Sequence, residues 1–481
     1  MSGLYKNAGA TFVLKIIGLA IGFILQIFLG RMLGAELYGK YTMYLTYTVI
    51  LSVISVFGMD QNLIKEIPKY FDKNYKSGAY LKLSLQLSIL ITMILSITLL
   101  VLNRLSDLGF NLLILILMLY IKTIITIIDG FLQGRGFVVK VTLLNIVINN
   151  LLKIAFFFVL INLHVNTLNS ALYAIILSEV ITLSIRIPSV ISFLHPRDRK
   201  NSLIIEEKKE FIKYSGTVAL IAGIGMLIQS VDKIMISTFL DLDNVGFYKV
   251  SQNYVSLISI FIAPFVAFWP VISKLYYENK IREIEIEMRK IVTIIIHLVI
   301  PMFFLFTYLS NELLLVFGTE YTTEMSKKVL IILSFSFLVD AMSGPIGSIL
   351  TMTKYAKYVL YNNIISLTLN IILNYFLIKS YGIVGVAVAT GISIIVNNLL
   401  SIIEVQLLLG IFSYNRSNVY QVMGLIVFNL IACWGIDNVL SINNNYLYII
   451  SFGLILYISN GIILYLFKRN ELRSLMKAWR S

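Results

Sequence analysis

The residues that could do chemistry in this sequence are ionisable and amide side chains set inside long apolar segments. Ionisable residues fall within such segments at Lys15, Lys122, Asp129, Lys153, Glu179, Arg186, Asp232, Lys233, Asp340 and Glu404. A charge is costly in hydrocarbon, so each of them is a functional hypothesis by default. Several lie close to the end of their segment, where a side chain that reaches the interface is the alternative explanation. The chemistry indicated is the binding of small ions and of charged substrates.

One group of polar residues has the composition of a cation site. Asn370 and Asn374 are four residues apart, so a helix would place them on one face. Asp232 and Thr390 would add one formal negative charge and a hydroxyl oxygen. Oxygen ligands of this kind suit a hard cation such as sodium. The alternative is that these side chains only join neighbouring helices by hydrogen bonds.

Catalytic residues of the usual kinds are scarce. The single cysteine, Cys433, excludes an intrachain disulfide and a cysteine metal cluster. The three histidines, His164, His195 and His297, stand in no motif. We therefore expect a protein that is not an enzyme and that has no cofactor beyond a coupling ion, Na⁺ or H⁺. A membrane polymerase or acyltransferase is the alternative from the class of enzymes.

The elements that must position these side chains are membrane-spanning helices. Apolar residues make up 58% of the 481 residues, and runs of roughly 20 apolar residues, enough to cross a hydrocarbon core, recur along the chain. Backbone groups in lipid must be satisfied within the segment, so the runs are predicted to be helices. We expect an all-α integral membrane protein with about 14 transmembrane helices, at 9–30, 41–59, 83–102, 112–131, 141–161, 170–194, 214–238, 248–270, 291–309, 328–350, 359–378, 383–409, 419–436 and 446–467.

The basic residues predict the orientation. If the N-terminus is inside, the inner connections carry 27 of the 39 Lys and Arg residues, including Arg197, Arg199 and Lys200, and the outer connections carry 6. Cytoplasmic connections are enriched in Lys and Arg. This enrichment, rather than a nucleic-acid partner, explains the net charge of +14. Both termini of this multi-pass cell-membrane (cytoplasmic or inner membrane) protein are therefore predicted to be cytoplasmic.

The chain resembles itself at an offset of 207 residues. The matching residues are Leu33, Gly39 and Tyr41 with Leu240, Gly246 and Tyr248, and near an offset of 218 the region of Asn145 matches that of Asn363. The repeat predicts two parallel six-helix lobes around a central cavity, an arrangement typical of transporters that move two lobes around a midplane site. The predicted organisation is an N-lobe at 1–210, a C-lobe at 211–410, and two further helices with a basic cytoplasmic tail at 411–481.

Five segments in this order resemble the multidrug/oligosaccharidyl-lipid/polysaccharide exporter superfamily, and in particular its polysaccharide transporter branch. They are RMLGAELYGKY, FLQGRGF, QSVDKIMISTFLDLDNVGFY, VFGTEY and LNIILNYFLIKSYGIVGVAVAT. Each segment is weak evidence alone, but together they extend over most of the chain. The resemblance implies a flippase of the O-antigen or capsule-unit kind. It would move a short glycan on undecaprenyl diphosphate from the cytoplasmic to the outer face by alternating access, for cell-surface polysaccharide synthesis.

The lipid II flippase branch of the superfamily suggests ligands for the cation site. Its sodium site resembles a set here made of Asp232, Asn370, Asn374, Thr390 and the carbonyl of Val386. The sequence departs from that branch at Asn374, where the branch has a carboxylate. This halves the formal negative charge and should weaken cation binding.

The substrate diphosphate needs basic partners, and Arg suits phosphate oxygens because its fork can bind two of them. Arg31 resembles a cavity arginine of the lipid II branch through its R-x-L-G context. The other cavity arginines have no clear counterpart, so substitutes are expected among Lys15, Lys122, Lys153, Lys249 and Arg186. For Lys153 the alternative is pairing with Asp129 or Glu179 inside the helix bundle.

The expected partners are the undecaprenyl-diphosphate-linked oligosaccharide, membrane lipid, and polymerase or chain-length proteins of the same pathway. The alternative within the superfamily is a cation-coupled exporter of drugs or metabolites. The cationic balance of the spans favours an anionic substrate over a cationic drug.

Overall fold

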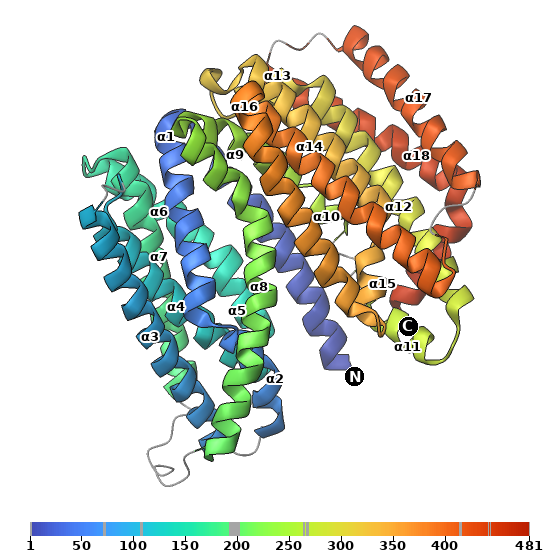
Figure 1. Ribbon diagram of the computed structural model, residues 1–481. Helices are drawn as coiled ribbons and strands as arrows, with labels where there is room; N and C mark the ends of the chain where they lie inside the picture. Colours follow the sequence, from blue (N-terminus) through green and yellow to red (C-terminus); the bar gives the residue numbers. More distant parts are fainter. Residues whose placement is uncertain are drawn as a thin grey trace. The chain divides into compact units, whose positions relative to one another are not determined.

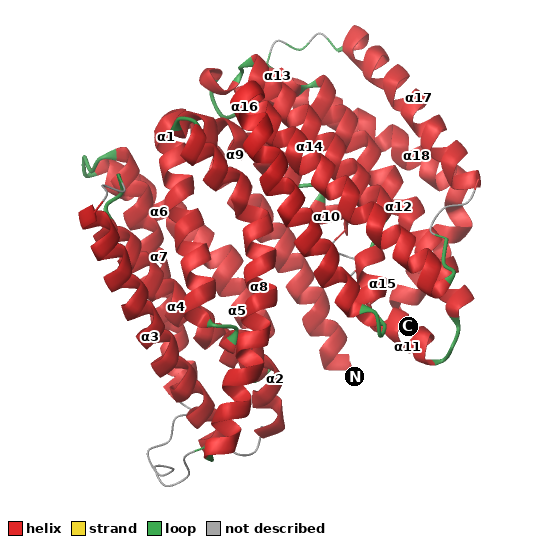
Figure 2. Ribbon diagram, in the orientation of Figure 1, coloured by secondary structure: helices red, strands yellow, loops and turns green. Residues whose placement is uncertain are grey.

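The computed structural model describes residues 2–70, 74–105, 109–191, 203–262, 265, 269–412, 416–440, 442 and 444–480. Their regular secondary structure is entirely helical, and no strand occurs among them (Figure 2). The prediction of an all-α protein is confirmed. The chain divides into two compact units, Met1–Ser237 and Thr238–Ser481. The predicted basic connection at Arg197, Arg199 and Lys200 lies outside the described residues.

The first unit is built around one buried helix, α4. Its elements are α1 (Ser2–Val56), α2 (Met59–Glu66), a 3₁₀ turn (Ile67–Tyr70), α3 (Asn74–Leu105), α4 (Leu112–Gly134), α5 (Val138–Thr142), a π-helical turn (Leu143–Ile148), α6 (Asn149–Asn162), α7 (Thr167–Ile191) and most of α8 (Ile205–Phe239). Helix α4 packs against α1, α2, α3 and α7 (Figure 1). Leu119, Ile127 and Phe131 of α4 are fully buried as a result.

The two longest helices, α1 and α16 (Ala356–Leu409), are each broken at a glycine. Gly34 has φ 73° and Gly382 has φ 55°, values that favour glycine because it has no Cβ. Each break separates two predicted spans, 9–30 from 41–59 and 359–378 from 383–409. A helix of this length contains more than twice the roughly 20 residues that one crossing needs.

The first part of helix α8 packs on the first unit. The Asn62 amide on α2 donates to the Phe211 carbonyl and to the Ser215 hydroxyl, both at 2.9 Å. Lys76 on α3 forms a 2.6 Å ion pair with Glu207. These contacts join residues far apart in the sequence, and the predicted lobe boundary at 210 stays a prediction.

The second unit packs around α12 (Ile281–Tyr308), α14 (Glu324–Ser343) and α16. Its other elements are α9 (Leu242–Ser256), α10 (Ser259–Ile262), α11 (Trp269–Tyr277), α13 (Ser310–Leu315), a 3₁₀ turn (Thr319–Tyr321), α15 (Ile346–Met352), α17 (Arg416–Val439) and α18 (Asn445–Arg480). Helices α17 and α18 pack on α12 and on each other. The Tyr457 hydroxyl donates to the Leu298 carbonyl at 3.1 Å. The predicted segment 411–481 is therefore part of the second unit.

Ten helices among the described residues are long and apolar enough to cross a membrane, or eleven if the bent pair α14 and α15 counts as one span. This count takes α1 and α16 as one helix each. The chain is therefore a multi-pass membrane protein. The number 14 and the arrangement of six plus six helices stay predictions.

Candidate functional site

Three residues of the predicted cation set meet in the second unit. The Asn374 amide donates to the Asn370 side-chain oxygen at 2.9 Å, and the Asn370 amide donates to the Thr390 hydroxyl at 3.3 Å. Asn370 and Asn374 are buried on the first half of α16, and Thr390 lies on its second half. Helix pairing through buried amides would have this geometry too, so the contacts fit both interpretations.

The other two members of the set, Val386 and Asp232, belong to different units. Val386 is buried and lies one turn before Thr390 on α16. Asp232 is buried on α8 and belongs to the first unit. The binding of one cation by all five residues therefore stays a prediction.

Arg186 is enclosed in a buried network of the first unit. Its Nε donates to Asp129 Oδ1 at 2.6 Å, and one terminal nitrogen donates to the Asn145 side-chain oxygen at 2.7 Å. The Asn145 amide donates in turn to Asp129 Oδ2, also at 2.7 Å. The Arg186 side chain has 0% exposure. It offers a substrate no surface, and we leave it out of the proposed substrate site.

Sequence reasoning did not single out Asn145, which completes this network. It lies in the π-helical turn Leu143–Ile148 between α5 and α6. A π turn inside an α-helix shifts the direction of the following side chains and often occurs at functional positions. The available signal was the repeat, which matched the region of Asn145 with that of Asn363.

Two lysines lie inside the first unit. Lys122 on α4 borders a cavity of about 160 Å³, whose other polar lining residues are Asp60, Gln61, Thr126, Asp129, Gln133 and Asn145. Lys153 on α6 is half-buried, and Lys122 and Glu179 are the charged groups that act on it. Glu179 itself is buried on α7. The group of Lys122, Lys153 and Glu179, called here the basic cluster, carries a net positive charge.

Asp60, on the rim of this cavity, lies in α2 outside the candidate spans. Burial raises the pKa of its carboxyl above the usual value, although hydrogen bonds from Gln61 act in the opposite direction. A carboxyl of this kind gains a proton more easily than an exposed one. Protonation of Asp60 would make the polar end of the cavity still less negative.

The remaining predicted substrate residues lie on other helices than the residues of the basic cluster. Arg31 is exposed on α1, three residues before the break at Gly34, and Lys15 is exposed on the first half of α1. Lys249 is half-buried on α9 of the second unit. Of the predicted substrate residues, Lys122 and Lys153 are the two for which an electrostatic interaction with each other is given.

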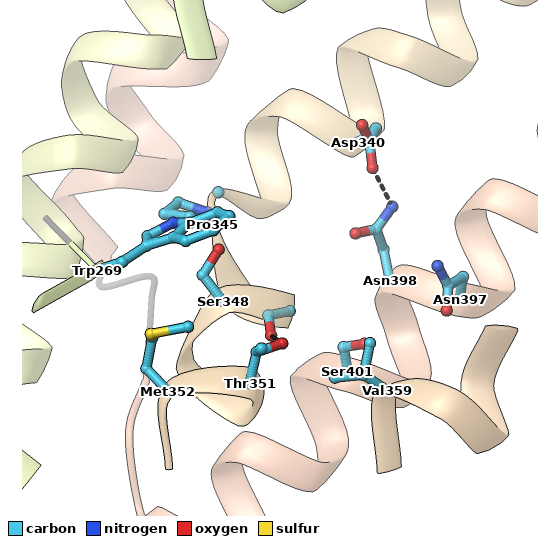
Figure 3. Close-up of a pocket in the computed structure, with 12 residues that line it drawn as sticks. Trp269, Asp340, Pro345, Ser348, Thr351, Met352, Val359, Asn397, Asn398 and Ser401 are labelled. Carbon is cyan, nitrogen blue, oxygen red and sulfur yellow. Dashed lines mark hydrogen bonds between the residues drawn. The ribbon is translucent and has the colours of Figure 1, made fainter. Parts of the chain in front are cut away.

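A second cavity, of about 270 Å³, lies in the second unit between α14, α15 and α16 (Figure 3). Asp340 lines it, together with Ser348, Thr351, Asn397, Asn398 and Ser401. Sequence reasoning listed Asp340 as an ionisable residue of a span but gave it no partners. The feature of the sequence that could have pointed to Asn398 is that it is a polar residue inside the predicted span 383–409.

Comparison with known proteins adds independent findings. The family model described as "Polysaccharide biosynthesis protein" matches residues 4–276, and the model described as MatE matches residues 218–376. The chain is 26% identical over 403 residues to the probable low-salt glycan biosynthesis flippase Agl15 of Haloferax volcanii, covering 82% of each chain.

The fold is similar to solved transporter structures. The lipid II flippase MurJ in an inward closed conformation matches with a TM-score of 0.69 at 17% identity, covering 96% of this chain and 98% of that one. An inward-facing multidrug resistance MATE family transporter of the MOP superfamily matches with a TM-score of 0.64 at 16% identity, covering 83% and 98%.

Proposed function

The chain belongs to the polysaccharide biosynthesis protein family, and from this premise we propose that it is a flippase for undecaprenyl-diphosphate-linked oligosaccharides. It moves the glycan head from the cytoplasmic to the outer face of the cell membrane, where cell-surface polysaccharide is assembled. The relative from Haloferax volcanii is described as a glycan flippase, and this description supports the class of substrate. No covalent chemistry is involved, so the protein is a transporter.

The observation that carries the proposal is the basic cluster. Lys122 on α4 and Lys153 on α6 interact electrostatically, and Glu179 is the acidic residue that acts on Lys153. A net positive charge inside an apolar helix bundle is costly unless an anion offsets it. A lipid diphosphate supplies such an anion. The cavity beside Lys122 is also lined by the amides of Gln61 and Gln133, which can hydrogen-bond phosphate or sugar oxygens.

Transport follows from the parallel repeat. Two lobes that rock against each other expose a midplane site alternately to each side of the membrane. The polar head would cross among Arg31, Lys15, Lys122, Lys153 and Lys249, while the prenyl chain stays in lipid. Asp232, Asn370, Asn374, Thr390 and the Val386 carbonyl would hold a sodium ion. The oxygen chemistry of these residues fits that ion, and Na⁺ or H⁺ would couple the movement.

A multidrug exporter of the same superfamily is the second candidate. The MatE match over residues 218–376 and the similarity to a MATE transporter favour it. Charge separates the two candidates, because a cationic drug would be repelled by the basic cluster.

Substrate binding tests the proposal directly. We expect the purified protein to retain a labelled undecaprenyl-diphosphate oligosaccharide, and Lys153→Gln to lower its affinity by about 10- to 100-fold. This range is the worth of a hydrogen bond to a charged group, roughly 1.5–3 kcal/mol. Lys153→Arg should keep the affinity within a few-fold, since it preserves the charge.

The matched control is Lys379→Gln. Lys379 is exposed on α16, where it lies over the Tyr375 ring at 4.5 Å, so its loss should leave binding unchanged. Equal affinity in all three variants would rule the basic cluster out. Retention of cationic amphiphiles in place of the anionic lipid would favour the exporter.

A further inference from the structure

Half of the residues that line the cavity of the second unit have an oxygen in their side chain. Asp340 extends from α14, Ser348 and Thr351 come from α15, and Asn397, Asn398 and Ser401 come from the second half of α16 (Figure 3). Trp269 and Met352 close its apolar side. The volume of about 270 Å³ leaves room for a small ion with a water molecule or two.

Asp340 brings a formal negative charge to this cavity without a matching cation. Its Oδ1 accepts a hydrogen bond from the Asn398 amide at 2.9 Å. Within the described part of the chain, no Lys, Arg or His nitrogen lies within 4.0 Å of the Asp340 carboxylate. An amide satisfies one lone pair but leaves the charge in place, and a charge inside a membrane bundle calls for a counter-ion.

The backbone next to Asp340 adds to the negative potential. Helix α14 ends at Ser343, and α15 starts at Ile346 after a bend of 46°. Pro345 has no N–H group to continue the helix ladder. The negative end of the α14 dipole therefore lies near the cavity. Broken helices of transporters bind cations at such helix ends.

The first unit contains a similar arrangement, in which the guanidinium of an arginine side chain supplies the positive charge. Asp129 lies on α4 and pairs with Arg186 on α7 at 2.6 Å. Asp340 follows Asp129 by 211 residues, and Asn398 follows Arg186 by 212 residues. Both offsets fall between the repeat offsets of 207 and 218. In each unit, the two helices that carry these residues pack against each other. They are α4 and α7 in the first unit and α14 and α16 in the second.

The repeat-related asparagines extend the contrast. Asn145 lies in the network of Asp129 and Arg186. Asn362, the residue before Asn363 in the matching region, donates to Glu404 Oε2 at 2.7 Å and to the Ser401 hydroxyl at 3.3 Å. The second unit thus holds two carboxylates, Asp340 and Glu404, hydrogen-bonded to amides where the first unit holds one carboxylate and one guanidinium.

We propose that the cavity at Asp340 binds a monovalent cation, Na⁺, which takes the place that the Arg186 guanidinium fills in the first unit. The ligands are the Asp340 carboxylate and the side-chain oxygens of Asn398, Ser348 and Thr351. The first unit is permanently neutralised at this position, and the second is neutralised only when the ion is present. Sodium therefore stabilises the second unit selectively.

This site is separate from the cation set predicted around Asn370 and Thr390. Asn398 lies two helical turns beyond Thr390, about 12 Å along α16 at 1.5 Å per residue. The inference also does not depend on the substrate of the protein, since it concerns the charge balance of the second unit alone.

Thermal unfolding of the full-length protein in detergent tests the proposal. All measurements are made on a chain that carries Asp232→Asn, so that the predicted set around Asn370 cannot produce the response. Replacing choline chloride by sodium chloride at constant ionic strength should raise Tm, in a saturable way, by about 2–4 °C. Asp340→Asn should abolish this rise.

Two further variants keep the test decisive if Asp340→Asn folds poorly. Asn398→Arg copies the first unit into the second, so it should keep Tm in choline at or above the parent value and lose the sodium response. The exchange Asp340→Asn with Asn398→Asp returns a carboxylate to the cavity and should restore the response. A sodium response that survives in Asn398→Arg, or an identical Tm in both salts for the parent chain, would overturn the proposal.

Discussion

Arg186 shows how one residue type can carry two opposite interpretations. In the sequence it is a cation within an apolar span and a candidate for phosphate binding. In the structure it has 0% side-chain exposure and is held by Asp129 and Asn145. Sequence alone could not decide between these roles, because the three residues meet only after α4, the π turn and α7 have packed. Lys153 stays a candidate for phosphate binding, because the acidic Glu179 and the basic Lys122 both act on it.

At this scale we predict that Arg186→Gln destabilises the first unit by about 3–5 kcal/mol, since it leaves the Asp129 charge buried without a partner. The double variant Arg186→Gln with Asp129→Asn should recover much of the loss, because no buried charge remains. Urea or thermal unfolding measures both.

The control is the Lys76–Glu207 ion pair, whose side chains keep 25% and 22% exposure. Lys76→Gln should cost no more than about 1 kcal/mol. If the loss in Arg186→Gln is no larger than that in Lys76→Gln, the buried network does not stabilise the unit.

At the scale of elements, apolar runs locate the helices well where polar caps bound them. The predicted span 112–131 became α4 at Leu112–Gly134, whose first turn is capped by the Asn111 side chain accepting from the Ile114 N–H at 3.4 Å. The span predicted at 328–350 was less accurate. Helix α14 begins at Glu324, with Thr323 as its cap, and breaks at Gly344. A polar first turn is not visible to hydropathy.

Close packing of α4 on α2 depends on Gly130 and Gly134, which lie four residues apart on one helix face. A Cβ on Gly134 would lie 2.9 Å from the Ile67 Cβ and from the Leu63 carbonyl oxygen. Small residues at such a spacing let membrane helices approach closely. The packing of α2 on α4 therefore depends on the absence of these two side chains.

We predict that Gly134→Ala pushes α2 and the 3₁₀ turn away and costs about 1–3 kcal/mol. Gly225→Ala on α8, where the added Cβ meets nothing within 4 Å, is the control and should be neutral or slightly stabilising. Thermal unfolding of the two variants measures the difference. Equal Tm values would show that the seam between α2 and α4 tolerates a methyl group.

At the scale of the whole molecule, the sequence predicted a polytopic helical protein of two related halves, and the structure divides into two compact units. Asn62 and Lys76 bind the first part of α8 to the first unit, and the lobe boundary at 210 stays a prediction. The predicted repeat pairs Asp129 with Asp340 and so indicates where the two halves differ in charge.

The most direct test of the central claim is transbilayer movement of a labelled undecaprenyl-diphosphate oligosaccharide in proteoliposomes that contain the purified protein. We predict movement that depends on the protein, falls about tenfold or more in Lys153→Gln, and is retained in Lys153→Arg and in Lys379→Gln. Movement that is equally fast in Lys153→Gln, or no movement of the lipid-linked glycan while cationic amphiphiles are exported, would contradict the account.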